Sequence, residues 1–104
     1  MDFIQPANFT GNKAWEALNI ANIEGASVKL HWTDKPYIWH KNDGKEVLVV
    51  LDGTIVMHYK LNNVELLKTM NAGDICNIDE GDDHVAHPVN GSARILVIEK
   101  ENSI

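Results

Sequence analysis

Residues 40–53 read HKNDGKEVLVVLDG, which places a histidine and a glutamate on either side of a turn signal and then continues as an apolar strand into a second turn. Side chains alternate between the two faces of a strand, so the loop length of a hairpin decides whether His40 and Glu46 share a face. A two-residue turn at 43–44 would separate them, whereas a three-residue loop would bring them together. If these two side chains form a site, the hairpin interpretation predicts a loop with an odd number of residues.

Composition limits the kinds of protein and partner that the chain can represent. With 104 residues, 44% hydrophobic and 23% charged, it matches one ordinary globular domain. A net charge of −6 repels phosphate groups, so nucleic acid and membrane surfaces are not expected partners. Cys76 is the only cysteine, which excludes an internal disulfide and favours a reducing compartment. The start, MDFIQPANFT, resembles neither a signal peptide nor a membrane span, and we expect a cytoplasmic protein.

Turn signals recur along the chain about every ten residues, without a long helical period. Residues 15–23 fit a short helix about as well as a strand, but Glu24-Gly25 followed by ASVKLHW indicates a hairpin, so we favour a strand. In YIWHK, residues 37–41, alternation would place Ile38 and His40 on one face. The pattern predicts an all-β sandwich or barrel. We divide the chain into an arm with the first strand (1–25), a barrel (26–100) and a short tail (101–104).

Two predicted strands, EVLVVL and ARILVIEK, are apolar on both faces. A small barrel buries one face of a strand against its own core, so the second face needs another cover. A partner subunit is the simplest cover, although the N-terminal arm is an alternative. We therefore predict a homodimer.

The spacing of polar residues around this stretch resembles that of the cupin superfamily, in particular the small single-domain proteins of the cupin 2 conserved barrel family. The first cupin motif has a glycine, then H-x-H, a glutamate and a closing glycine at fixed intervals. His40, Glu46 and Gly53 match it, Asn42 stands at the second histidine, and Asp34 at the leading glycine.

The second cupin motif has a glycine, then P-x-G, a histidine and an asparagine. Gly73, Gly81 and His84 match it, while Asp79 replaces the proline and Pro88 the asparagine. The resemblance covers residues 26–100 and implies a double-stranded β-helix, or jelly-roll barrel.

The resemblance also implies a divalent metal ion, such as Mn, Fe, Ni or Zn, inside the barrel. His40, Glu46 and His84 would be its ligands, a two-histidine, one-carboxylate set that leaves positions open for substrate. Asn42 is a candidate fourth ligand, but an asparagine before Asp-Gly is first a turn residue, and we favour the turn. The alternative for His40 and Glu46 is an ordinary cross-strand pair.

Three functions remain open from the sequence. The first is a metal-binding cupin with isomerase-like or dioxygenase-like activity on a small polar, sugar- or acid-like molecule. The second is a metal-free binding or sensing module for small molecules, and the third is a homodimeric interaction subunit without catalysis.

The remaining chemically active side chains are interpreted as structural. Cys76 is expected to be an inert core residue, and DEGDD, residues 79–83, a solvated turn. Several aromatic residues could line a pocket or a dimer interface, and we favour the interface: Trp32, Tyr37 and Trp39. Further histidines are expected to be structural or exposed: His31, His58 and His87.

Overall fold

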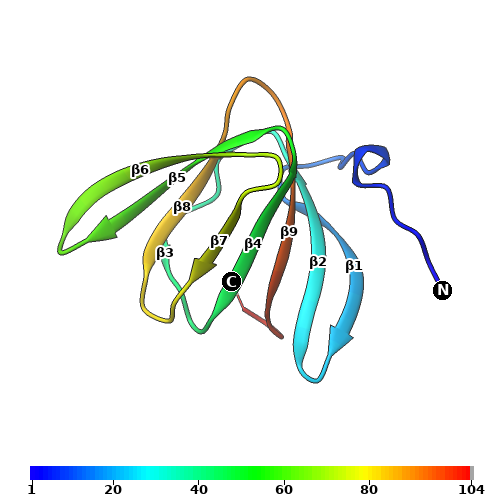
Figure 1. Cartoon of the computed structure of the whole chain (residues 1–104), viewed down its shortest axis with the longest axis horizontal. Coiled ribbons are helices and arrows are strands. Elements are labelled where there is room, and N and C mark those ends of the chain that lie inside the picture. The colour runs from blue at the N-terminus through cyan, green and yellow to red at the C-terminus, as the bar shows by residue number, and fades with distance from the viewer. Residues whose placement is uncertain (104) are drawn as a thin grey trace.

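The computed structural model describes residues 1–103, which form two antiparallel sheets and almost no helix (Figure 1). One sheet has the strand order β1-β2-β9-β4-β7 and the other the order β3-β8-β5-β6. The strands are β1 Glu16–Ile23, β2 Ala26–Thr33, β3 His40–Lys41, β4 Glu46–Asp52, β5 Thr54–Leu61, β6 Val64–Asn71, β7 Ile75–Ile78, β8 Asp83–Pro88 and β9 Ala93–Lys100. This is a jelly-roll barrel, so the predicted fold class is confirmed. Ile104, the last residue of the predicted tail, lies outside the described residues.

The core lies between the two sheets and is built by alternation along their strands. On β4, Leu48 and Val50 are buried, whereas Val47 and Val49 on the other face are half-buried. On β5, Ile55 and Met57 are buried while His58 faces outward, as predicted. No helix within residues 1–103 has the length and hydrophobicity of a membrane span.

The ambiguous segment at 15–23 is a strand, as we favoured. β1 pairs with β2 across a tight turn at Glu24 and Gly25, whose φ angles are +51° and +89°. Positive φ at both central residues matches the right-handed twist of the flanking strands, and this is why a glycine stands there.

The predicted hairpin between His40 and Glu46 is wrong in both registers. β3 pairs with β8, whereas β4 pairs with β7 and β9 in the other sheet. The loop between β3 and β4 therefore crosses from one sheet to the other. It is directed by the turn at 79–82, because the backbone of Asn42 donates to the Asp82 carbonyl (2.9 Å) and accepts from Gly81 N–H (2.8 Å). The two strands that are apolar on both faces, β4 and β9, are neighbours in the larger sheet, and each is paired along both of its edges.

The strand predicted at 37–41 is also shorter than expected. Only His40 and Lys41 form a ladder, while Tyr37 N–H donates to the Ala86 carbonyl at 3.1 Å. Without a regular strand the faces do not alternate, and the rings of Tyr37 and His40 meet edge to face with centroids 5.3 Å apart.

Gly53, which closes the first motif, has a structural role. Its φ is +82°, and a Cβ at this position would lie 2.6 Å from the carbonyl oxygen of Ser92. Both the left-handed backbone and the close approach require glycine in the turn between β4 and β5.

Candidate functional site

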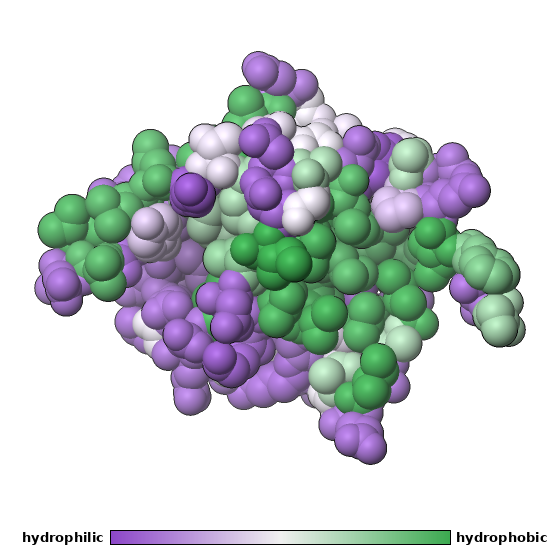
Figure 2. Space-filling view, viewed as in Figure 1, coloured by the Kyte–Doolittle hydropathy of each residue, from purple (hydrophilic) through white to green (hydrophobic). Residues whose placement is uncertain are grey.

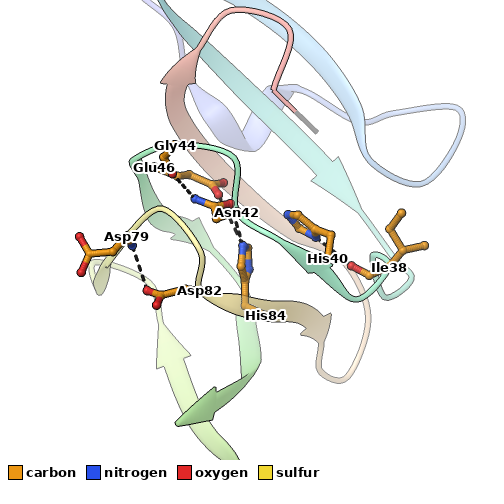
Figure 3. A network of polar contacts seen from close by, with 8 residues as sticks. All are labelled: Ile38, His40, Asn42, Gly44, Glu46, Asp79, Asp82 and His84. Carbon is orange, nitrogen blue, oxygen red and sulfur yellow. Dashed lines mark hydrogen bonds and ion pairs between the residues drawn. The ribbon is translucent and has the colours of Figure 1, made fainter. Parts of the chain in front are cut away.

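His40, Glu46 and His84 converge inside the barrel from three strands (Figure 3). His40 on β3 lies directly opposite His84 on β8, and Glu46 enters from the start of β4 in the facing sheet. One ligand atom from each residue lies within 4.8 Å of the others. The structure thus brings together the three residues that the sequence singled out, although by a chain path that the hairpin interpretation did not foresee.

The orientation of His40 leaves one ring nitrogen free. Its Nδ1 lies 3.0 Å from the carbonyl oxygen of Ile38, which can only accept, so the proton resides on Nδ1. Nε2 is buried and has no hydrogen-bond partner among the described residues. A backbone carbonyl that holds the far nitrogen is the usual support of a metal-binding histidine.

Asn42 is both a turn residue and part of the site. It is only 4% exposed, its Nδ2 donates to the Gly44 carbonyl (2.7 Å), and its Oδ1 lies 3.0 Å from His84 Nε2. The bond to Gly44 orients the amide so that its oxygen faces the histidine. Our preference for a plain turn therefore described only half of its environment, because the loop folds inward between the sheets.

Burial sets the charges of the site. It raises the pKa of the Glu46 carboxyl from 4.5 to about 7, with a further contribution from the negative charge of Glu99, while the Asn42 amide acts in the opposite direction. Burial, together with the nearby His40, lowers the pKa of His84 from 6.5 to about 4. Although His84 Nε2 lies 3.7 Å from Glu46 Oε1, the two do not form an ion pair at neutral pH, because the imidazole is uncharged.

The negative charges of the acidic turn next to His84 do not reverse the lowering of the His84 pKa. Asp82 and Asp83 favour the charged imidazole, but their effect on its pKa is smaller than that of burial. Asp82 accepts from the Asp79 N–H at 2.9 Å, and Asp83 pairs with Lys41 at 3.2 Å. The turn is mostly exposed, as predicted, and the pKa of His84 stays lowered to about 4.

The residues present fit a divalent metal ion. His40 Nε2, Glu46 Oε1 and His84 Nδ1 are buried without a hydrogen-bond partner in the described chain, and such atoms are rare in folded proteins unless something binds them. Ligands at about 2.1 Å from one ion lie up to about 4.2 Å apart, so small side-chain rotations would suffice. Two imidazoles and one carboxylate are suitable donors for Mn, Fe, Ni or Zn.

A cavity of about 150 Å³ adjoins the cluster and adds residues that sequence reasoning missed or judged structural. Trp15, Lys29, His31 and Glu99 line it, as do the three candidate ligands. The sequence pattern could have indicated some of these cavity residues. Lys29 and His31 oppose the inward-facing residues of β9, and Glu99 continues their series, so each is a polar residue on the core face of a strand.

The three aromatic residues left open by the sequence separate in the structure. Tyr37 lines the cavity, contrary to the interface that we favoured for it. Trp39 lies on the outside, 42% exposed, with the Lys60 ammonium 5.1 Å from its ring centroid. Trp32 is half-buried on the outer side of β2 and does not line the cavity.

The other reactive side chains lie away from the cluster. His58 and His87 stack on the outer face of the smaller sheet with ring centroids 4.1 Å apart. Cys76 is half-buried against the core, and burial raises the pKa of its thiol, which agrees with an inert residue.

Two sheets in jelly-roll order, with histidines and a carboxylate converging in the barrel, define the class as a cupin-type barrel. The sequence matches no protein-family model and no curated protein. Among solved structures, a cupin-2 domain protein from Shewanella frigidimarina is 25% identical, with a TM-score of 0.72 over 88% of this chain and 85% of that one. The chain is accordingly a small cupin domain.

Two further structures support the fold. A cupin superfamily protein from Desulfitobacterium hafniense has a TM-score of 0.76 at 11% identity, over 96% of this chain and 92% of that one. A hydroquinone 1,2-dioxygenase in complex with Fe3+ has a TM-score of 0.76 at 17% identity. The match covers 88% of this chain but only 29% of the dioxygenase chain.

Proposed function

We propose that this cupin domain binds one divalent metal ion through His40, Glu46 and His84 and acts on a small polar molecule in the adjoining cavity. The observation that carries the proposal is the convergence of one ligand atom from each of the three residues within 4.8 Å, at a place where each residue also has a buried polar atom without a partner in the described chain. Asn42 is the candidate fourth ligand, because its side chain is buried at the cluster and its Oδ1 lies 3.0 Å from His84 Nε2.

The protein side chains divide the work of such a site. A bound ion would supply Lewis-acid polarisation of a carbonyl or hydroxyl group of the substrate. The Ile38 carbonyl, 3.0 Å from His40 Nδ1, holds the imidazole of His40 in place. Between isomerase-like and dioxygenase-like activity, the second has more support, since two histidines and one carboxylate are typical of non-haem iron oxygenases and one structural neighbour is an iron-bound dioxygenase.

Titration of chelator-treated protein with Mn(II), Fe(II), Ni(II) and Zn(II) tests the metal. We expect one ion per chain for at least one of them, with a rise in Tm that depends on metal concentration. The measurements are elemental analysis and thermal unfolding. Substoichiometric metal and an unchanged Tm for all four ions would refute the metal site and favour the metal-free binding module.

We also propose that the outer face of the larger sheet pairs with a second copy of the chain. Val49 on β4 lies between Ile75 on β7 and Leu96 on β9, and Val47 lies beside Ile98. The first three residues form an apolar row across three strands, the other two form a second row on β4 and β9, and Ile75 is 68% exposed. Figure 2 shows hydrophobic side chains gathered over the centre and right of the view, where the larger sheet lies in Figure 1.

The N-terminal arm, the alternative cover, is held at one end of this face. Arg94 donates to the Phe9 carbonyl (2.7 Å) and to Thr10 (3.1 Å) and pairs with Asp52. Phe3, nearer the start, is 89% exposed, so its ring does not cover the rows.

Sedimentation velocity at micromolar concentration tests the dimer. We expect a dimer for the wild type and a monomer for Val49→Lys, because a lysine in the centre of an apolar interface leaves a charge without water. Leu67→Lys, which alters an exposed leucine on the other sheet, is the control and should remain dimeric. A monomeric wild-type protein would overturn the proposal.

A further inference from the structure

Five rings form a continuous chain along the cavity. The pairs His31–Trp15, Trp15–Tyr37, Tyr37–His40 and His40–His84 have centroids 5.9, 5.2, 5.3 and 4.4 Å apart. All five residues line the cavity, and their planes are tilted by 58° to 86° from ring to ring. Inclined rings offer edges and faces to a guest, which is the geometry that aromatic pairs prefer. One side of the cavity is therefore an aromatic wall that leads to the candidate metal ligands.

Trp15 is held in this wall at a cost to the backbone. Its φ is +61°, in the left-handed region that bulky side chains rarely adopt. Its indole N–H donates to the Lys35 carbonyl at 2.9 Å, and its own carbonyl lies 3.0 Å from His31 Nδ1. Such strained residues cluster at ligand sites, where the surrounding structure maintains them. The contacts fix Trp15 as a rigid part of the wall.

Charged and polar groups line the same cavity. Lys29 on β2 and Glu99 on β9 both line it, and no described carboxylate lies within 4.0 Å of the Lys29 ammonium. Ser103 also lines it, and its Oγ is buried without a partner among the described residues. With a divalent ion present, ionised Glu46 and Glu99 would balance the ion, and Lys29 would leave one positive charge. The cavity then favours a guest with one negative charge.

Size restricts the guest further. The cavity measures about 150 Å³. An apolar protein cavity of about this volume holds a benzene molecule, so one six-membered ring fits and two do not.

We infer that the cavity takes a single-ring aromatic carboxylate, with its ring against Trp15 and Tyr37 and its carboxylate on the Lys29 ammonium. This inference rests on the proposed function, because it names the substrate class of the same site. The groups that would contact the guest directly, Trp15, Tyr37 and Lys29, are not candidate metal ligands, so the experiment can separate the failure of one proposal from the failure of the other.

Isothermal titration of Zn(II)-loaded and chelator-treated protein with three probes tests it. Benzoate has the ring and the charge, cyclohexanecarboxylate has the charge on a saturated ring, and benzyl alcohol has the aromatic ring without the charge. We expect benzoate to bind at least about 10-fold more tightly than either, because it alone combines a carboxylate for the Lys29 ammonium with an aromatic ring for Trp15 and Tyr37.

Variants assign the roles. Lys29→Met should weaken the binding of benzoate about 10-fold or more and should change the affinity for benzyl alcohol little. Trp15→Leu should remove the preference for benzoate over cyclohexanecarboxylate. The chain offers a matched control pair on the outside, Lys60→Met and Trp39→Leu, which should change neither. Circular dichroism checks folding, and Trp15→Phe, a milder change that keeps an aromatic ring, should retain the preference.

The outcomes separate the two proposals. Zinc at one ion per chain with no benzoate binding would overturn the aromatic carboxylate and leave the metal site standing. Benzoate binding that depends on Lys29, in a protein that takes up neither zinc nor any of the other three ions, would support the ligand and refute the metal. If Lys29→Met binds benzoate as tightly as the wild type, the carboxylate does not lie on Lys29, and the inference is wrong.

Discussion

His84→Ala is expected to weaken the binding of Zn(II) or Mn(II) by about 100-fold or more. Loss of a residue that only supports a metal ligand typically costs 10–100-fold in affinity, and removal of a ligand should cost at least as much. His84 is buried and lies 3.7 Å from Glu46, so no exposed side chain can replace it without rearrangement of the barrel. Titration monitored by calorimetry or by competition with a coloured chelator gives the affinity.

His87→Ala is the matched control for this experiment. His87 lies on the same strand, but its ring is on the outer face against His58, so metal affinity should be unchanged. Urea unfolding of both variants separates a lost ligand from a lost fold. If His84→Ala folds and binds metal as tightly as the wild type, His84 is not a ligand.

Glu46→Gln is expected to make the metal-free protein more stable than the wild type at pH 8 by about 3 kcal/mol, with little difference at pH 4. Burial raises the pKa of Glu46 from 4.5 to about 7. The folded state therefore keeps the carboxyl proton longer than the unfolded state does. Its contribution to stability is fully present below pH 4.5 and is lost as the pH rises through 7. At about 1.4 kcal/mol per pKa unit, the loss is about 3 kcal/mol, and a neutral glutamine avoids it.

The comparison with the wild type is needed because His84 acts in the opposite direction. Burial in the folded state lowers the pKa of His84 from 6.5 to about 4. Its contribution to the free energy of unfolding therefore rises with pH between these two values and masks much of the effect of Glu46. Urea unfolding in chelator from pH 4 to pH 8 gives the difference between the two proteins. Glu80→Gln, at an exposed position of the acidic turn, should track the wild type. A constant difference between Glu46→Gln and wild type at all pH values would show that Glu46 is not buried as a carboxyl group.

Much of the fold could be predicted because local signals agree with it. Alternation along 54–60 assigned the inner and outer faces of β5 correctly, and Glu24-Gly25 marked the first hairpin. The spacing of the two cupin motifs also selected the three residues that meet in the barrel.

Strand pairing was the part that local signals misassigned. Residues 40 and 46 lie close in sequence with a turn signal between them, which is the usual pattern of a hairpin. In the structure they reach the same site from opposite sheets, because β4 pairs on both edges with distant strands and β3 pairs with β8. Alternation specifies which face a side chain occupies but not which strand lies beside it.

By itself the sequence determined the period of the strands, the positions of the turns and the identity of the candidate ligands, since these depend on neighbours along the chain. Only the tertiary structure decided that Trp15, Lys29 and Glu99 share a cavity with them. Those three residues belong to different parts of the chain, and they meet because burial of the apolar faces brings the two sheets together around a space that polar side chains line.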